Sequence, residues 1–187
     1  MLDQSHHPSR HNGTATALAS ARLQGAGAPP VDGAAFRQAL SLFATGVTVI
    51  TAAGPDGRIA ALTANAFTSV SLDPPLILAC IGQRSGALAT LRAAGRFAVH
   101  ILAADQDETA RVLARRGSDK LDAVRFRRGE SGAPVLDGCL ARLDCDLARE
   151  YDGGDHAILL GTVTRIDAGN DGAPPLTFFR GQLGALG

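Results

Sequence analysis

Residues 58–81 constrain the fold more than any other part of the sequence. The segment RIAALTANAFTSVSLDPPLILACI contains two short strand-like runs, a Pro-Pro turn and a third run that is apolar on both faces. Pro75 has no N–H group to donate to a neighbouring strand, so it suits the first residue of the third strand and not its middle. The apolar residues 76–81 that follow predict a central strand, covered on both faces.

Turn signals join further strands into hairpins. Gly54-Pro55-Asp56-Gly57 is a turn sequence in which proline fixes φ and glycine permits a positive φ. Gly153-Gly154 is a second hairpin signal later in the chain. The other runs with strand-forming patterns are 47–53, 58–62, 96–102, 140–150, 157–167 and 176–179.

Three capped segments predict short helices. Asp32 is an N-cap candidate before apolar residues at helical spacing, and Gly46 is a candidate end. Ser85 and Gly95 bound a second helix in the same way, and Asp105 begins a third with a capping-box pattern that runs to about residue 115. Because most of the strands are linked by hairpins and few helices interrupt them, the sequence predicts a mainly β fold. A closed or split antiparallel barrel fits this pattern better than a doubly wound parallel sheet.

The first 31 residues differ in composition from the rest. They are rich in Ala, Gly, Ser and His and lack the continuous apolar segment of a secretory signal. We therefore predict a disordered tail at 1–31 and one domain at 32–187. His6, His7 and His11 lie in this tail, where no fixed geometry is expected, so no metal site is predicted.

Charge and cysteine content exclude several classes of protein. The 18 basic and 18 acidic residues balance, so a nucleic-acid partner is not supported. No apolar run reaches the roughly 18 to 20 residues that span a bilayer. The three cysteines form neither an even set nor a C-x-x-C pair, which favours a cytoplasmic protein over a disulfide-bonded one.

Small polar residues in the middle of segment 58–81 suggest a binding surface. Thr63-Ala64-Asn65-Ala66 carries only a hydroxyl and an amide, so a planar heterocycle could lie close to the backbone and pair with its N–H and C=O groups. An ordinary polar edge strand explains the same composition, and from composition alone it is the favoured interpretation.

Several cationic and polar side chains could complete such a site. Arg84 and Ser85 stand at a predicted helix start, whose free N–H groups and positive dipole end suit a phosphate. Lys120 and Arg180 could neutralise a phosphate or carboxylate. His156 follows the Gly153-Gly154 turn, where it could supply a proton or a hydrogen bond near neutral pH. A capped helix without a ligand and solvated surface side chains remain alternatives for all of them.

The pieces together resemble the short-chain flavin reductase family, the reductase components of two-component flavin-dependent monooxygenases. The matching segments follow the family's order and cover nearly everything after residue 32. They are FRQALSLFATGVTVIT (36–51), LTANAFTSVSLDPPLILACI (62–81), RFAVHIL (96–102), SDKL (118–121), GAPVLDG (132–138), DGGDH (152–156) and FFRG (178–181).

The resemblance implies a fold and an activity. It implies an FMN-binding split β-barrel, present as a homodimer, that binds FMN or FAD and oxidises NADH or NADPH. The reaction implied is hydride transfer from the nicotinamide C4 to the flavin N5, with reduced flavin passing to a partner monooxygenase or reacting with oxygen. A flavin-binding sensor or carrier without turnover is the alternative. A related barrel oxidase acting on a pyridoxal compound is a third reading, against which the DGGDH segment argues.

The resemblance also assigns site residues. Those expected to contact the isoalloxazine ring, the ribityl chain or the flavin edge are Thr63, Ala64, Asn65, Ala66, Cys80, Ile81 and Gly82. Those expected at the flavin phosphate are Ser85 and Lys120, and those expected at the nicotinamide nucleotide are His156 and Arg180. His156 would position or polarise the reactants. Three positions depart from the family pattern, since Ala66 replaces a frequent Ser, Leu121 a usual Phe and His100 a usual Asn.

Overall fold

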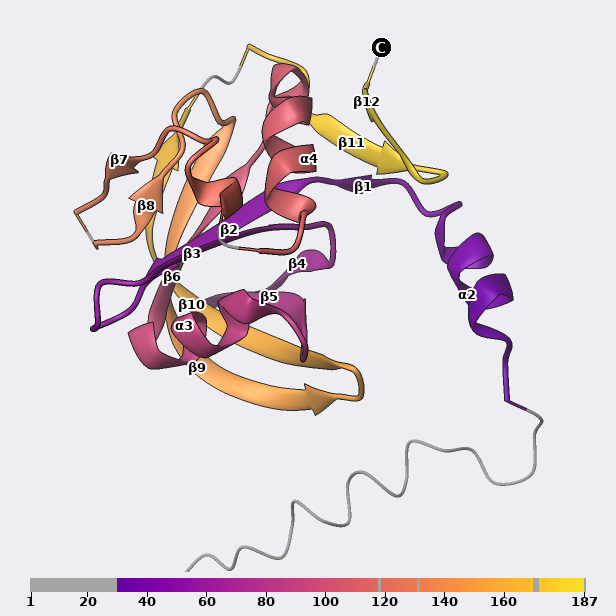
Figure 1. Cartoon of the computed structure of the whole chain (residues 1–187), viewed down its shortest axis with the longest axis horizontal. Coiled ribbons are helices and arrows are strands. Elements are labelled where there is room, and N and C mark those ends of the chain that lie inside the picture. The colour runs from indigo at the N-terminus through magenta and orange to yellow at the C-terminus, as the bar shows by residue number, and fades with distance from the viewer. Residues whose placement is uncertain (1–29, 118, 131, 170–171, 187) are drawn as a thin grey trace, which may run out of the picture. The chain divides into compact units, whose positions relative to one another are not determined.

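A seven-stranded antiparallel sheet forms the centre of the computed structural model, in the order β3-β2-β6-β9-β10-β5-β4 (Figure 1). The structure describes residues 30–117, 119–130, 132–169 and 172–186. The predicted tail at 1–31 therefore lies, apart from Pro30 and Val31, outside the described residues. The description below concerns the unit Asp32–Gly187.

The strands and helices have the following bounds. The strands of the large sheet are β2 (Thr48–Ala53), β3 (Ile59–Ala64), β4 (Phe67–Leu72), β5 (Pro75–Gly82), β6 (Arg96–Ile101), β9 (Ala141–Gly153) and β10 (His156–Ala168). The smaller sheets contain β1 (Thr45–Gly46), β11 (Leu176–Phe179) and β12 (Gln182–Ala185), and β7 (Arg127–Arg128) with β8 (Pro134–Val135). The helices are α2 (Gly33–Leu40), α3 (Gly86–Ala94) and α4 (Asp107–Ala114), with 3-10 turns η1 (Ala104–Gln106) and η2 (Asp119–Leu121).

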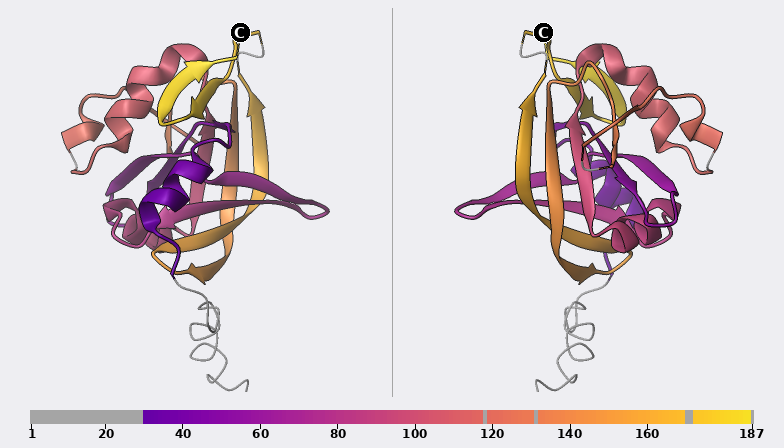
Figure 2. Two further views of the ribbon diagram at one scale, coloured as in Figure 1. Left: turned by 90° about the vertical axis from the view of Figure 1, so that its right-hand side faces the viewer. Right: turned by 90° about the vertical axis from the view of Figure 1, so that its left-hand side faces the viewer.

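The large sheet curves but does not close, because its end strands β3 and β4 do not pair with each other. The strand pairs of the described residues are all antiparallel. Figure 2 shows the long β9–β10 hairpin curving around the molecule and the β4–β5 hairpin extending beyond it. This is the split barrel that the sequence predicted.

Two clusters of buried side chains cover opposite faces of β2. The first lies on the concave side of the sheet, where Phe97, Ile50 and the α3 residues Leu88 and Leu91 pack together. The second joins Val49 and neighbouring apolar residues to α4 and β11. Since α3 and α4 cover opposite faces of the same strands, β2 and β3 are packed between the two helices.

Gly161 shows how closely the first cluster is packed. A Cβ atom at this position of β10 would lie 2.7 Å from the ring of Phe97, closer than two carbon atoms approach. The absence of a side chain at residue 161 therefore makes room for the largest fully buried side chain of the core.

Most sequence-predicted elements are confirmed. Pro75 is the first residue of β5, and Ser85 and Gly95 cap α3, with Gly95 in the left-handed conformation at φ 64°. The prediction that residues 76–81 form a central strand covered on both faces was wrong. The strand β5 lies next to the end strand β4, and only alternate residues are fully buried, because one of its faces is covered only in part.

Two predicted helices have different bounds in the structure. The first helix ends at Leu40 and not at Gly46, because Gly46 pairs with Thr177 in the β1–β11 ladder. The helix predicted from Asp105 divides into η1 and α4. The short strands β1, β7, β8 and β12 were not predicted. Of the helices in the described residues, none is long and apolar enough to cross a membrane.

His100 is fully buried on β6 and connects three segments. Its Nδ1–H donates to the carbonyl of Val49 at 3.1 Å, and its Nε2 accepts from the Leu136 N–H at 3.3 Å. These two partners require the neutral ring, with the proton on Nδ1. Burial lowers the pKa of His100 from 6.5 to about 4, and the charges of Arg142 and Arg127 act in the same direction.

We expect this histidine to make stability depend on pH. The unfolded chain takes up a proton on this ring at a higher pH than the folded chain does. The free energy of unfolding is therefore unaffected by the protonation of His100 above pH 6.5 and decreases as the pH falls from 6.5 to about 4. The total loss is at most about 3 kcal/mol. Denaturant unfolding at pH 7, 5.5 and 4 measures this loss of stability. The variant His100→Asn should lose most of the dependence of the free energy of unfolding on pH. An equal dependence in the wild type and the variant would assign it to other groups.

Candidate functional site

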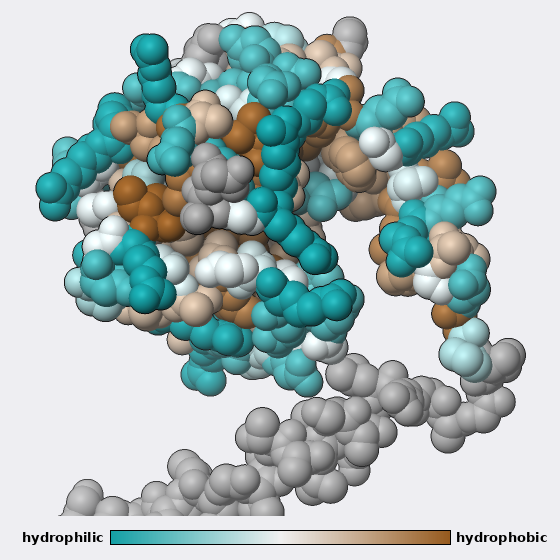
Figure 3. Space-filling view, viewed as in Figure 1, coloured by the Kyte–Doolittle hydropathy of each residue, from teal (hydrophilic) through white to brown (hydrophobic). Residues whose placement is uncertain are grey.

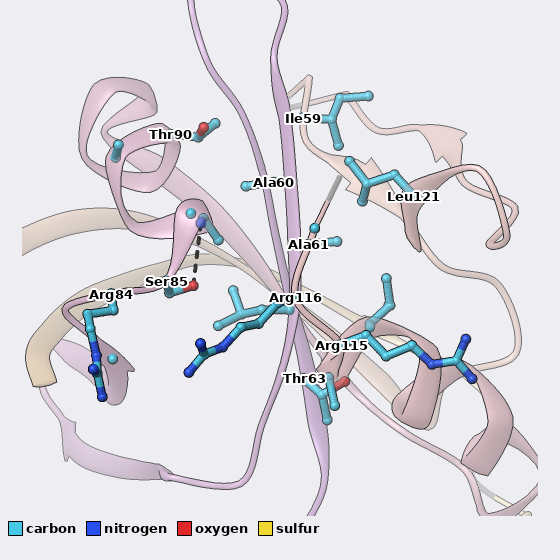
Figure 4. Close-up of a pocket in the computed structure, with 18 of the residues that line it drawn as sticks. Ile59, Ala60, Ala61, Thr63, Arg84, Ser85, Thr90, Arg115, Arg116 and Leu121 are labelled. Carbon is cyan, nitrogen blue, oxygen red and sulfur yellow. Dashed lines mark hydrogen bonds between the residues drawn. The ribbon is translucent and has the colours of Figure 1, made fainter. Parts of the chain in front are cut away.

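The free edge of β3 lies in a cavity of about 790 Å³. Within the described residues β3 pairs with β2 alone, so the backbone groups on its other side have no strand partner. The N-terminal end of α3 and the C-terminal end of α4 stand on either side of this edge (Figure 4). Small side chains at Ala60 and Ala61 keep the edge accessible. The cavity therefore offers backbone hydrogen-bonding groups to a flat ligand.

The α3 side of the cavity begins with Ser85. Its side chain caps the helix by accepting from the Ala87 N–H at 3.4 Å, and Ser85 is half-buried. A Cβ atom added to Gly86 would meet nothing within 4 Å, so open space lies directly at the helix start. This end carries the positive pole of the helix and attracts anions.

The α4 side is fixed to β3 by Thr63. Its hydroxyl donates to the carbonyl of Ala110 at 2.6 Å, and this bond uses the hydroxyl's one proton. Thr63 can therefore only accept a hydrogen bond from a ligand. Arg115 and Arg116 follow α4 directly, and both line the cavity.

The cavity is strongly positive. Four arginines line it, Arg58, Arg84, Arg115 and Arg116, whereas Asp155 is the one acidic residue among the lining residues that the structure describes. Arg58 is paired with Asp56 outside the cavity at 3.1 Å. An excess of guanidinium groups over carboxylates favours an anionic ligand.

A second cavity of about 300 Å³ adjoins the first. The two share Thr63 and Ala114, and the second is lined mainly by apolar side chains, including Val47, Phe178 and Leu183. Together they offer an apolar region beside a cationic one, on the two sides of Thr63. An amphiphilic molecule with a flat apolar part and an anionic part matches this distribution.

The β9–β10 turn brings His156 to the α3 end of the first cavity. His156 pairs with Gly82 across the sheet, and its Nδ1 lies 2.6 Å from Oδ1 of Asp155. The carboxylate accepts a hydrogen bond from Nδ1–H, so Nε2 is the nitrogen left for a ligand. This hydrogen bond is the main cause that lowers the pKa of Asp155, and the charge of Arg84 acts in the same direction.

Six of the sequence-predicted site residues line these cavities. Gly82, Arg84, Ser85 and His156 line the first, Asn65 lines the second, and Thr63 lines both. They come from β3, β5, the start of α3 and the β9–β10 turn. The tertiary structure thus gathers residues that lie up to 93 positions apart in the chain, from Thr63 to His156.

The other predicted site residues are not among those that line the two cavities. Ala64 and Ile81 point into the first core cluster, so only their backbone groups face outwards. Ala66 and Cys80 are joined by a hydrogen bond from Cys80 N to Ala66 O at 2.9 Å, and burial raises the pKa of the Cys80 thiol.

Lys120 and Arg180 are both placed by local contacts. Lys120 Nζ donates to the Leu113 carbonyl near the end of α4 at 2.8 Å. Arg180 stands at φ 51° in the β11–β12 turn, over the ring of Phe179 at 5.1 Å. Its neighbour Gly181, and not Arg180 itself, lines the second cavity.

Sequence reasoning missed Arg115, Arg116 and Asp155. Asp155 belongs to the DGGDH segment, so its place beside His156 was the available signal. The two arginines follow a predicted helix, but the sequence does not indicate on which side of the helix end each side chain lies.

Known proteins resemble this chain along most of its length. It matches the family described as flavin reductase like domain over residues 40–187. It is 44% identical to FMN reductase (NADH) SmoA of Agrobacterium fabrum over 149 residues, which cover 80% of this chain and 83% of that protein. It is 36% identical to HsaB, the reductase subunit of a flavin-dependent monooxygenase of Rhodococcus jostii, over 155 residues, covering 83% of this chain and 78% of that protein.

A solved structure shares the fold. Streptomyces globisporus NADH:FAD oxidoreductase SgcE6, in complex with NAD and FAD fragments, aligns with a TM-score of 0.78 at 38% identity, covering 86% of this chain and 98% of that chain. The chain spans only 48% of the length of another relative, a probable flavin reductase of Rhizobium meliloti that is 40% identical. Since the family match covers most of the chain and agrees with the fold, this protein belongs to the flavin reductase-like family.

Proposed function

We propose that the protein is an NAD(P)H:flavin oxidoreductase that reduces FMN or FAD. The observation that carries the proposal is the pair of adjoining cavities, cationic on one side of Thr63 and apolar on the other. The names of the relatives, an NADH-dependent FMN reductase and an NADH:FAD oxidoreductase, support the same activity.

The residues of the two cavities fit a flavin nucleotide. The β3 edge offers unpaired backbone groups for the polar edge of the ring, and the apolar side chains of the second cavity suit the ring face. Ser85 and the start of α3 suit the phosphate. Thr63, Asn65 and Gly82 are the predicted ring-side residues that the cavities support, and the backbones of Ala64, Ala66, Cys80 and Ile81 adjoin them.

A bound flavin supplies the chemistry of accepting a hydride. The chain's own residues bind the two nucleotides, orient their rings and limit the access of water. We propose that His156 contacts the nicotinamide nucleotide, and that Asp155 holds its imidazole in one tautomer. In this tautomer His156 accepts a hydrogen bond at Nε2 and positions the nicotinamide. Arg180 is proposed as a further contact to that nucleotide, and Lys120 as one to the flavin phosphate.

A direct assay tests the proposal. Purified protein with excess FMN or FAD should consume NADH or NADPH, followed as loss of absorbance at the nicotinamide band. A protein that binds flavin but consumes neither nicotinamide nucleotide would instead be a flavin carrier or sensor. Comparison of both flavins and both nicotinamide nucleotides gives the preferred pair.

The role of His156 has its own test. We expect His156→Gln to lower kcat/KM for NADH about 10-fold, the effect of losing one hydrogen bond in the transition state, and to leave the Kd for flavin unchanged. His100→Asn is the matched control, because it removes a buried histidine that lines neither cavity. An unchanged kcat/KM for NADH, or a parallel loss of flavin binding, would contradict the assignment.

We also propose that the protein forms a homodimer. The helix α2 has no buried residue, and Phe36 and Leu40 on it are 55% and 56% exposed. Leu42 and Phe43, which follow the helix, are 58% and 73% exposed. Figure 3 shows hydrophobic, brown atoms on the part of the molecule at the right of the view, where Figure 1 places α2. An isolated helix of eight residues is marginal in water, so a second copy of the chain is the proposed cover for this apolar surface.

Sedimentation equilibrium tests the dimer. Wild-type protein should have about twice the chain mass of 19.2 kDa, and Phe36→Asp should shift it towards the monomer. Gln38→Asp adds the same charge to a polar position of the same helix and should leave the dimer intact. A wild-type monomer at micromolar concentration would rule the proposal out.

A partner protein and a cellular location are also proposed. HsaB is named as a subunit that serves a flavin-dependent monooxygenase, and we propose that this protein supplies reduced flavin to such a partner. Cys80, Cys139 and Cys145 are free thiols, which supports the proposed cytoplasmic location.

A further inference from the structure

Gln83, the first residue after β5, holds the turn that carries His156. Its backbone N–H donates to the carbonyl of Asp155 at 2.9 Å, and its side-chain Nε2 donates to the carbonyl of His156 at 3.3 Å. Since Gly82 pairs with His156 in the β5–β10 ladder, these bonds continue the ladder one residue beyond the end of β5. The backbone that bears the imidazole is therefore fixed from the neighbouring strand.

Arg92 sets the orientation of the Gln83 amide. Its Nη2 donates to Oε1 of Gln83 at 3.4 Å. A guanidinium group offers only donors, so the amide turns its oxygen towards Arg92 and its NH2 group towards the His156 carbonyl. An amide turned the other way would place two oxygen atoms against each other, and the bond to His156 would be lost.

Glu150 holds Arg92 in turn. Nε of Arg92 donates to Oε2 of Glu150 at 2.9 Å, and Nη2 donates to Oε1, so guanidinium and carboxylate form a paired contact. The contact joins the last turn of α3 to β9, which forms a hairpin with β10 (Figure 1). Gln83, Arg92 and Glu150, here called the Gln83 network, thus connect three segments of the chain.

The Gln83 network is better placed to act on the site than on stability. The side chains of Arg92 and Glu150 are 45% and 29% exposed, and ion pairs in contact with water add little to stability. The network ends on the backbone of His156, whose Nε2 lies 3.9 Å from the place of a Cβ atom on Gly82, at the lining of the first cavity.

We propose that Gln83 is a positioning residue for His156, and that Arg92 and Glu150 orient its amide. The inference rests on the proposed function, because it takes His156 to contact the nicotinamide nucleotide. Gln83 lines neither cavity, so it acts through the turn and not on a ligand. A hydrogen-bonding group contributes fully to the rate only where its support holds it in the reacting geometry, so a small shift of this turn weakens the contribution of His156.

Gln83→Met tests the positioning role. Methionine is of similar length but cannot donate to the His156 carbonyl, while the backbone bond to Asp155 remains. We expect kcat/KM for NADH to fall about 3- to 10-fold, the effect of losing one neutral hydrogen bond, and the Kd for flavin to stay unchanged. In the double variant Gln83→Met/His156→Gln, kcat/KM should equal that of His156→Gln alone, because Gln83 acts through that ring.

Exchanging the two charges separates positioning from stability. In Arg92→Glu/Glu150→Arg the ion pair forms again, but a carboxylate at residue 92 attracts the NH2 group of Gln83 away from the His156 carbonyl. The thermal unfolding temperature should match the wild type, while kcat/KM for NADH should stay as low as in Gln83→Met. Arg127→Gln is the matched control, because it breaks an exposed pair with Asp137 that lines neither cavity, and its kcat/KM should stay unchanged.

Nitrogen NMR of the His156 ring gives a readout that needs no flavin and no turnover. The signals are assigned by their absence from His156→Gln. The wild type and Arg127→Gln should show one tautomer, with the proton on Nδ1, whereas Gln83→Met should show a mixture of both tautomers. Identical ring signals in the wild type and Gln83→Met would overturn the inference, whether or not the protein oxidises NADH.

The kinetic outcomes separate the inference from the proposed function. An unchanged kcat/KM in Gln83→Met would overturn the positioning role, as would losses that multiply in the double variant or full recovery of kcat/KM in the charge exchange. A parallel loss of flavin binding in Gln83→Met would also overturn it, since the effect would then lie at the connection to α3. Wild-type protein that consumed neither NADH nor NADPH would contradict the proposed function itself, and the NMR comparison would still decide whether Gln83 positions the ring.

Discussion

The free edge of β3 is the constraint on which the site depends. An unpaired strand edge exposes backbone N–H and C=O groups and usually has to be covered or paired. Here α3 and α4 stand on opposite faces of the strand, and Thr63 ties the strand to α4 through its hydrogen bond to Ala110. The strand is thus held on both faces while a cavity lies along its edge, and the backbone groups of the edge are available to a ligand.

The same arrangement explains the distribution of charge. The start of one helix and the end of another meet at this edge, so the positive pole of α3 lies at a cavity that the arginines after α4 also line. On the other side of Thr63 the lining comes from β11, β12 and α4, whose apolar residues also build the second core cluster. A single strand thus separates a cationic region from an apolar one, which is the division that a flavin nucleotide carries within one molecule.

Local sequence signals anticipated the strands well. Pro75, Ser85 and Gly95 each mark a boundary through a backbone property, namely a missing N–H, a capping oxygen and a positive φ. Gly46 was assigned to the end of a helix because glycine is common there, but it pairs with β11, some 130 residues further along the chain. Such pairing depends on long-range contacts, which turn signals and helical spacing do not encode.

The amino-acid sequence alone predicted the fold class and about half of the site. The turn signals, the period of the strands and the small residues at 63–66 are local properties, and they predicted a closed or split antiparallel barrel and pointed to Thr63, Ser85 and His156. The resemblance to the flavin reductase family added the split barrel and Gly82. Which way the cationic side chains extend follows from the tertiary structure. Arg115 and Arg116 are neighbours of equal charge, yet their side chains extend in opposite directions, and Lys120 donates to the helix end that precedes them. The direction of a side chain at a helix end follows from how that helix packs on the sheet, and this packing arises only when distant segments come together.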